Sequence, residues 1–330
     1  MQNNGWQWIT WTLMSVTLVS TAGRLQADEP PAAEKSAPAD AQPTDSRPAI
    51  TVFKNVKYAE HGEQALLADV YLPAGDGPFP GVLMIHGGAW MSGSKWHMTR
   101  HARETAEAGY TVVAIDYRLA PKHPFPAQIE DCRAALRWMT DNAERYKIDT
   151  RRLAAYGYSA GGHLACLLGL EDVRPNADGQ AGAEGQAAVG AANAPARLSA
   201  IVAGGAPCDF RDLPPNNTAL AYFLGGSRAE KPKTYEQASP AAYATADDPP
   251  TFFFHGGSDL LVPLHGPRQL MESLKTLGVR TSLYVVPGKG HLATFLDATV
   301  TVRAIEFLNQ QLSGPADAPG ESADRTESSP

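Results

Sequence analysis

The residues with the clearest chemical potential form a serine motif near the middle of the chain. Residues 157–161 read Gly-Tyr-Ser-Ala-Gly and match G-x-S-x-G, in which small flanking residues permit a strained strand-to-helix turn. Such a turn lifts the serine hydroxyl out of a sheet. An apolar run at 153–156 precedes the motif, and an apolar helical pattern at 160–170 follows it. We therefore predict that Ser159 is a nucleophile.

A nucleophilic serine needs a histidine that takes its proton and an acid that fixes the tautomer of that histidine. Asp259 follows a predicted strand at 251–255, and His291 follows another at 281–286. Both residues therefore stand at the carboxyl ends of strands, the same edge as Ser159, where open sheets build their sites. An acid followed by a histidine is also the order expected after a serine in this turn. We predict that His291 is the base and Asp259 the acid.

Each of these two roles has rivals. They are His255 and His265 for the base, and Asp209, Asp247 and Asp248 for the acid. The two histidines lie in a turn and on a predicted helix, and two of the three aspartates precede a strand instead of following it. Asp209 follows a strand end and is the second choice for the acid. In the purely structural alternative, Asp259 caps the next helix and His291 only begins one.

A second motif could stabilise the negative charge that develops on a carbonyl oxygen. Residues 86–90 read His-Gly-Gly-Ala-Trp after an apolar strand and match the H-G-G-G type of oxyanion loop, with alanine in the third glycine position. We expect the backbone N–H groups of Gly88, Ala89 and Ala160 to be the donors. Trp90 and Tyr158 flank these groups and are the candidate substrate-binding side chains, although Trp90 could equally pack the loop.

The remaining histidines have structural interpretations. His163 lies on the predicted helix after Ser159 and fits a packed core histidine, and His86 would brace the oxyanion loop by hydrogen bonding. No histidine or cysteine spacing resembles a zinc site. We therefore expect no metal ion.

The elements that must position these residues alternate between short β-rich runs and helical patterns. The predicted strands are 51–57, 66–72, 81–86, 111–116, 153–157, 198–204, 251–255 and 281–286, and the predicted helices are 97–108, 126–145, 160–170, 264–277 and 291–312. This alternation predicts an α/β fold with a mostly parallel, doubly wound sheet of about eight strands and helices on both faces. The first two strands are expected to be antiparallel at one edge. Two inserts interrupt the pattern, a Gly- and Ala-rich loop at 172–197 and the segment 214–243, which we expect to select the substrate.

Composition separates a catalytic domain at 50–312 from its flanks. The chain has 330 residues and a formal charge of −7, and much of the acidity lies at 28–48 and 313–330, so the domain itself is near neutral. A near-neutral domain without a basic stripe gives no sign of nucleic-acid binding. We expect 28–49 to be a disordered linker and 313–330 a disordered tail.

The N-terminal residues 1–27 are predicted to be a signal peptide. The apolar run 6–19 is short for a membrane span, and small residues follow it, with cleavage plausible after Ala22 or Ala27. The segment before the run lacks Lys and Arg, so a retained membrane anchor stays open. Cleavage would give a secreted or periplasmic protein without stable membrane insertion. The three cysteines allow at most one disulfide, and two of them, Cys132 and Cys166, lie in apolar helical patterns typical of buried free thiols.

Taken together, the motifs at 86–90, 116–121, 125–138, 157–164, 238–240, 255–263 and 288–291 resemble those of the hormone-sensitive-lipase-like and feruloyl-esterase-like α/β hydrolases. The resemblance covers about residues 50–312. It implies ester hydrolysis without a cofactor, through an acyl-enzyme on Ser159, and some relatives act on carbohydrate-linked acyl groups.

Two alternatives remain. Tyr158 stands where many lipase-like relatives carry Asp, and the H-G-G-x-W form of the loop also occurs in kynurenine formamidases. An aryl formamidase would use the same serine, acid and base. A non-catalytic binding module on the same fold is the alternative from another class, although such modules usually lose one of the three groups.

Overall fold

The computed structural model describes residues 48–171 and 197–312. The predicted signal peptide, nearly all of the predicted linker, the predicted tail and residues 172–196 of the first insert lie outside the described residues. Expectations about these segments stay predictions.

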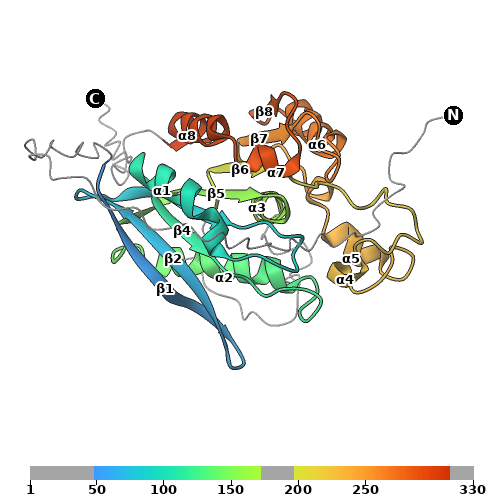
Figure 1. Cartoon of the computed structure of the whole chain (residues 1–330), viewed down its shortest axis with the longest axis horizontal. Helices are drawn as coiled ribbons and strands as arrows, with labels where there is room; N and C mark the ends of the chain where they lie inside the picture. Colours follow the sequence, from blue (N-terminus) through green and yellow to red (C-terminus); the bar gives the residue numbers. More distant parts are fainter. Residues whose placement is uncertain (1–47, 172–196, 313–330) are drawn as a thin grey trace, which may run out of the picture. The chain divides into compact units, whose positions relative to one another are not determined.

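Within the described residues, eight strands form one sheet in the order β1-β2-β4-β3-β5-β6-β7-β8 (Figure 1). Their bounds are β1 (Ile50–His61), β2 (Gln64–Pro73), β3 (Phe79–Ile85), β4 (Thr111–Ile115), β5 (Ile148–Tyr158), β6 (Ala200–Gly204), β7 (Thr251–Gly256) and β8 (Thr281–Val286). β2 is antiparallel to both of its neighbours, and every pair from β4 to β8 is parallel. The predicted largely parallel sheet, with an antiparallel pair at one edge, is confirmed.

Helices cover both faces of this sheet, because alternate side chains of each strand point to opposite sides. In β3, Leu83 and Ile85 belong to one buried core, and Val82 and Met84 belong to a second core. The first core takes the buried faces of α2 (Ala127–Asp141), α3 (Ala160–Leu170) and α6 (His265–Thr276), and the second takes those of α1 (Thr99–Glu107) and α8 (Ala298–Leu312) (Figure 1). Because these strands run in the same direction from β4 to β8 in the sheet order, their carboxyl ends, and the loops that follow them, lie at one edge of the sheet.

The prediction of a single helix at 291–312 is wrong, because the structure has two helices there, α7 (His291–Phe295) and α8. The Asp297 carboxylate accepts hydrogen bonds from the backbone N–H of Thr299 at 2.9 Å and from its hydroxyl at 2.7 Å. Asp297 therefore caps the start of α8, as acidic residues commonly do at helix N-termini. The break leaves α7 as a short helix that carries His291 at its first position.

The second insert contains α4 (Ala221–Leu224), α5 (Pro232–Gln237) and a 3-10 helix (Pro240–Ala242). Cys132, Cys166 and Cys208 are all buried and unpaired, as expected for at least the first two. Among the described residues, no helix has the length and apolar composition needed to cross a membrane.

Candidate active site

Ser159 lies at a sharp turn between β5 and α3. Its backbone is in a positive-φ conformation (φ 56°, ψ −120°) that costs a non-glycine residue of order 1–3 kcal/mol. The two glycines of the motif make this turn possible. A Cβ atom on Gly157 would lie 2.1 Å from the carbonyl oxygen of Gly161, and one on Gly161 would lie 2.1 Å from the carbonyl oxygen of Ile85. The spacing of glycines in the sequence is therefore a steric requirement of the turn.

Asp259 and His291 form a direct pair at the ends of β7 and β8. His291 donates its Nδ1–H to Asp259 Oδ2 at 2.6 Å, which leaves Nε2 free to accept a proton. The other carboxylate oxygen accepts the backbone N–H groups of Leu261 and Val262 at 2.9 Å each. Burial disfavours the Asp259 carboxylate, but the hydrogen bonds from His291 and Val262 outweigh burial and hold its pKa below the usual value. The acid therefore stays ionised and fixes the tautomer of His291.

The structure brings His291 to the same loops as Ser159. The Ser159 backbone N–H donates to the Gly204 carbonyl at 2.7 Å, and a Cβ on the next residue, Gly205, would lie 3.0 Å from Cε1 of His291. No hydrogen bond between the Ser159 hydroxyl and the His291 ring occurs among the described residues. Catalytic hydrogen bonds are often long in unliganded enzymes and tighten when substrate binds.

The loop at residues 86–90, called the oxyanion loop below, lies against Ser159. A Cβ on Gly87 would lie 3.2 Å from Ser159 Cβ. The backbone φ angle is 115° at Gly88, 51° at Ala89 and 58° at Trp90, so three consecutive residues have positive φ.

The three expected oxyanion donors, the N–H groups of Gly88, Ala89 and Ala160, take part in no hydrogen bond among the described residues. Three backbone N–H groups without a partner, close to a candidate nucleophile, form a receptive site for a negatively charged oxygen.

The two candidate substrate-binding side chains have other partners in the structure. Trp90 is only 4% exposed, donates its Nε1–H to His163 Nδ1 at 3.2 Å, and stacks on Phe223 with ring centroids 4.2 Å apart. Tyr158 is also 4% exposed and donates its hydroxyl to the backbone carbonyl of His291 at 2.5 Å. The structure thus favours a packing role for Trp90 and a supporting role for Tyr158 beneath His291, while direct substrate contact by either stays a prediction.

The sequence did not indicate how the second insert meets the oxyanion loop. Tyr222 of α4 donates its hydroxyl to the Ala89 carbonyl at 3.0 Å, and its neighbour Phe223 carries the stacking contact with Trp90. The sequence signal for these contacts is the adjacent aromatic pair Tyr222-Phe223 within this insert. These contacts connect the predicted substrate-selecting segment to the loop that carries two of the donors.

The rivals for base and acid have other partners. His255 is fully buried, donates its Nε2–H to the Val262 carbonyl at 2.8 Å, and lies 3.4 Å from Asp259 Oδ2. It therefore packs against the acid. Asp209 pairs with Arg211 at 2.6 Å. Within the described ranges, no group of His, Cys, Asp or Glu side chains could hold a metal ion.

The sheet topology and the turn that carries Ser159 define the class of protein as an α/β hydrolase. The BD-FAE family model matches residues 68–274, more than half of the chain, so the chain belongs to the BD-FAE family.

Curated relatives include esterase LipC of Mycobacterium tuberculosis, which is 30% identical over 248 residues, 71% of this chain and 59% of that protein. Esterase LipQ of the same organism is 29% identical over 228 residues, 68% of this chain and 53% of that protein. The matched region therefore spans little more than half the length of these relatives.

Solved structures of similar fold include a truncated form of a carbohydrate esterase from gut microbiota. It has a TM-score of 0.70 and 25% identity, and the match covers 82% of this chain and 98% of that one. A bifunctional GH43-CE protein of Bacteroides eggerthii has a TM-score of 0.69 and 28% identity over 79% of this chain and 35% of that one.

Proposed function

We propose that this chain is a serine carboxylesterase that forms an acyl-enzyme on Ser159. The observation that carries the proposal is the 2.6 Å hydrogen bond between Asp259 and His291, at the sheet edge where Ser159 precedes α3. A histidine of fixed tautomer beside a serine in a strained turn is the arrangement that activates a hydroxyl group toward an ester carbonyl. The esterases among the curated relatives support the same reaction class.

In the proposed mechanism, Ser159 Oγ attacks the ester carbonyl carbon while His291 Nε2 takes the hydroxyl proton. The carbonyl electrons move onto the oxygen, which the N–H groups of Gly88, Ala89 and Ala160 stabilise. His291 then gives its proton to the alcohol oxygen as the carbon–oxygen bond to the alcohol breaks. A water molecule attacks the acyl-enzyme in the same way, releases the carboxylic acid and restores the serine. Asp259 remains ionised throughout and stabilises the transient imidazolium.

The proposed substrates are esters in which a carbohydrate carries an acyl or feruloyl group. The similarity to a carbohydrate esterase over most of both chains supports this choice. The H-G-G-x-W form of the oxyanion loop keeps an aryl formamide as the rival substrate. A binding module without chemistry would not need Asp259 and His291 to be paired beside Ser159.

The test compares wild type with Ser159→Ala on short and long 4-nitrophenyl esters, acetylated xylan, methyl ferulate and N-formylkynurenine. Wild type should hydrolyse the esters, and the variant should lose turnover by several orders of magnitude. Wild-type rates in Ser159→Ala would contradict the mechanism. A strong preference for N-formylkynurenine would replace the esterase with a formamidase.

We also propose that the protein is exported, because residues 6–19 form an apolar run followed by small residues. Sequencing the N-terminus of protein recovered from the periplasm or the medium checks this. A mature chain that begins after Ala22 or Ala27 would support export, and a full-length chain retained in the membrane fraction would contradict signal cleavage.

A further inference from the structure

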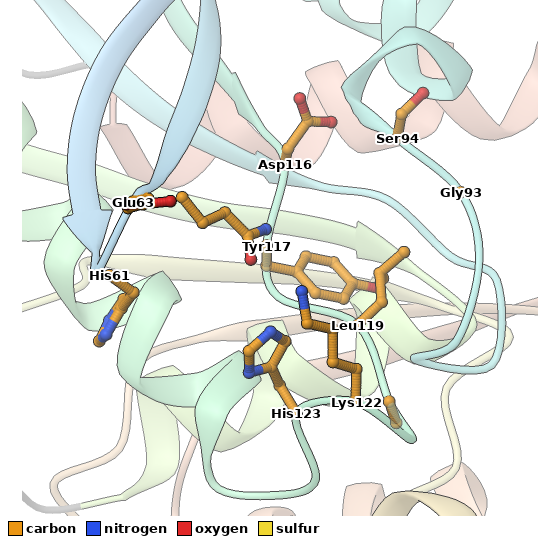
Figure 2. A pocket seen from close by; sticks show the side chains of 11 residues that line it. His61, Glu63, Gly93, Ser94, Asp116, Tyr117, Leu119, Lys122 and His123 are labelled. Atoms are coloured by element: carbon orange, nitrogen blue, oxygen red, sulfur yellow. The ribbon is translucent and has the colours of Figure 1, made fainter.

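A cavity of about 830 Å³ opens beside the oxyanion loop (Figure 2). Three segments line it: the tip of the β1–β2 hairpin with His61 and Glu63, residues 93–94 just after the oxyanion loop, and the loop at 116–123 after β4. β1, β3 and β4 run in the same direction, so these segments meet at the sheet edge that also carries Ser159. Along that edge, two strand spacings, about 10 Å, separate the end of β4 from the end of β5.

The wall of this cavity is joined to the oxyanion loop. Tyr117, which lines the cavity, stacks on His86 with ring centroids 4.2 Å apart and donates its hydroxyl to the His86 carbonyl at 3.0 Å. Ala120, also in the lining, donates its backbone N–H to the Trp90 carbonyl at 2.9 Å. The cavity and the candidate catalytic centre therefore share one loop.

Part of the polar lining is fixed by side-chain partners. His61 Nε2 lies 3.4 Å from Asp131, whose fully buried carboxylate is paired with Arg118 at 2.8 Å. Asp116 accepts a hydrogen bond from the Lys95 ammonium at 2.8 Å. These contacts fix the positions of His61 and Asp116 in the cavity wall.

Two charged side chains in the lining have no such partners. Glu63 from the hairpin and Lys122 from the loop after β4 are exposed and make no hydrogen bond or ion pair among the described residues. His123, which lies beside Lys122 in Figure 2, has a buried Nε2 atom with no hydrogen-bond partner in the described part of the chain. The cavity thus offers a carboxylate acceptor, from Glu63, and an ammonium donor, from Lys122, that have no partner in the described part of the chain.

We propose that this cavity is a subsite for sugar units of a carbohydrate-linked ester, beyond the unit that carries the acyl group. A hydroxyl group both donates and accepts, so the hydroxyls of a bound oligosaccharide can pair with the Glu63 carboxylate and with the Lys122 ammonium. An acyl chain would instead desolvate both charges without giving them a partner. His291 must protonate the alcohol oxygen, so the first sugar lies at the catalytic centre, and an oligosaccharide longer than a disaccharide can span the distance to the cavity.

This inference rests on the proposed function, and substrate length tests it. The substrates are acetylated xylobiose, acetylated xylotetraose and 4-nitrophenyl acetate, and the variant is Glu63→Gln combined with Lys122→Met. Wild type should hydrolyse the tetraose with a higher kcat/KM than the biose. The variant should lose about tenfold in kcat/KM on the tetraose, mainly through KM, since hydrogen bonds to charged groups are among the stronger ones. Its rates on the biose and on 4-nitrophenyl acetate should stay at the wild-type level.

The matched control is Glu272→Gln with Lys275→Met, which removes an exposed carboxylate–ammonium pair from α6, outside the cavity. This control should leave all three substrates unchanged. Deacetylated xylotetraose should also inhibit hydrolysis of 4-nitrophenyl acetate by wild type, and should do so more weakly in the cavity variant.

Equal losses on all three substrates, or no loss on the tetraose, would overturn the subsite. Wild type that cleaves 4-nitrophenyl acetate but neither cleaves nor binds the xylo-oligosaccharides would overturn the subsite and leave the carboxylesterase proposal standing. Different results would contradict the carboxylesterase proposal itself. They are the absence of turnover on every ester, or full activity of Ser159→Ala.

Discussion

The sheet edge that carries Ser159 has a polar region and an apolar region. Beyond β4, the proposed sugar subsite exposes charged side chains. Beyond β7 and β8, the chain exposes Leu260 (97%), Leu261 (54%), Leu292 (68%) and Leu296 (59%), each within five residues of Asp259 or His291. Single exposed leucines are common, but here four exposed leucines lie close in sequence to the two members of one acid–base pair. The contrast suggests that the reacting ester meets an apolar surface while the rest of the substrate meets a polar one.

The two regions also differ in how their polar groups are held. Asp259 and His291 are fixed by each other, by backbone N–H groups and by Tyr158, whereas Glu63 and Lys122 have no partner in the described residues. Chemistry needs atoms placed to within a fraction of an ångström, so its groups are held before substrate arrives. Recognition of a flexible sugar chain tolerates side chains that adjust on binding.

The largest loss of activity is expected from a change in the fixed pair of Asp259 and His291. Asp259→Asn should lower kcat on 4-nitrophenyl acetate by about 10⁴-fold, because an amide no longer fixes the tautomer of His291 or stabilises its cation. Asp209→Asn is the matched control, since Asp209 also follows a strand but pairs with Arg211. A small effect in the first variant together with a large one in the second would transfer the acid role to Asp209.

His163 of α3, which contacts the oxyanion loop through Trp90, should make the stability of the fold sensitive to acid. His163 accepts a hydrogen bond from Trp90 and donates one to the Ala238 carbonyl at 2.7 Å, so it is neutral, and burial lowers its pKa from 6.5 to about 4. Between these values the unfolded chain binds more protons than the folded one. The free energy of unfolding therefore falls as the pH falls from 6.5 to 4, by up to about 3 kcal/mol from this group.

His163→Gln removes that titration and can keep both hydrogen bonds, so its unfolding free energy should depend less steeply on pH. Urea denaturation between pH 7 and pH 4 measures the difference. The slope should not vanish, because burial also lowers the pKa values of His86 and His101 to about 4. An unchanged slope in the variant would mean that folding does not change the pKa of His163.

A smaller effect is expected from the contact between the second insert and the oxyanion loop. Tyr222→Phe removes the hydrogen bond to the Ala89 carbonyl and should lower kcat about tenfold with little change in KM, less than the loss of an oxyanion donor itself. Tyr243→Phe is the matched control, since its hydroxyl bonds to Gln237 within the same part of the chain. A raised KM with normal kcat would instead indicate that Tyr222 touches the substrate.

The sequence allowed prediction of those features that depend on neighbouring residues. The glycines around Ser159 and the strand ends before Asp259 and His291 are local patterns, and the structure has them where they were expected. Contacts between distant residues were missed. Tyr158 and His291 are 133 positions apart, as are Tyr222 and Ala89, and no local pattern encodes which hydroxyl reaches which carbonyl. The end of α7 was missed for a different reason, because the cap at Asp297 competes with an apolar pattern that continues through it.

The smallest expected effect tests the apolar region directly. The variant is Leu292→Ser combined with Leu260→Ser. It should hydrolyse 4-nitrophenyl acetate at nearly the wild-type rate and lose about threefold in kcat/KM on 4-nitrophenyl butyrate. The longer acyl chain has more methylenes to bury, and each contributes about 0.8 kcal/mol at most. Leu277→Ser, an exposed leucine at the end of α6, is the control. Equal losses on both esters would mean that the leucines support the fold around His291. If kcat/KM fell only on acetylated xylotetraose, the leucines would contact the sugar and not the acyl chain. That result would remove the contrast between the two regions.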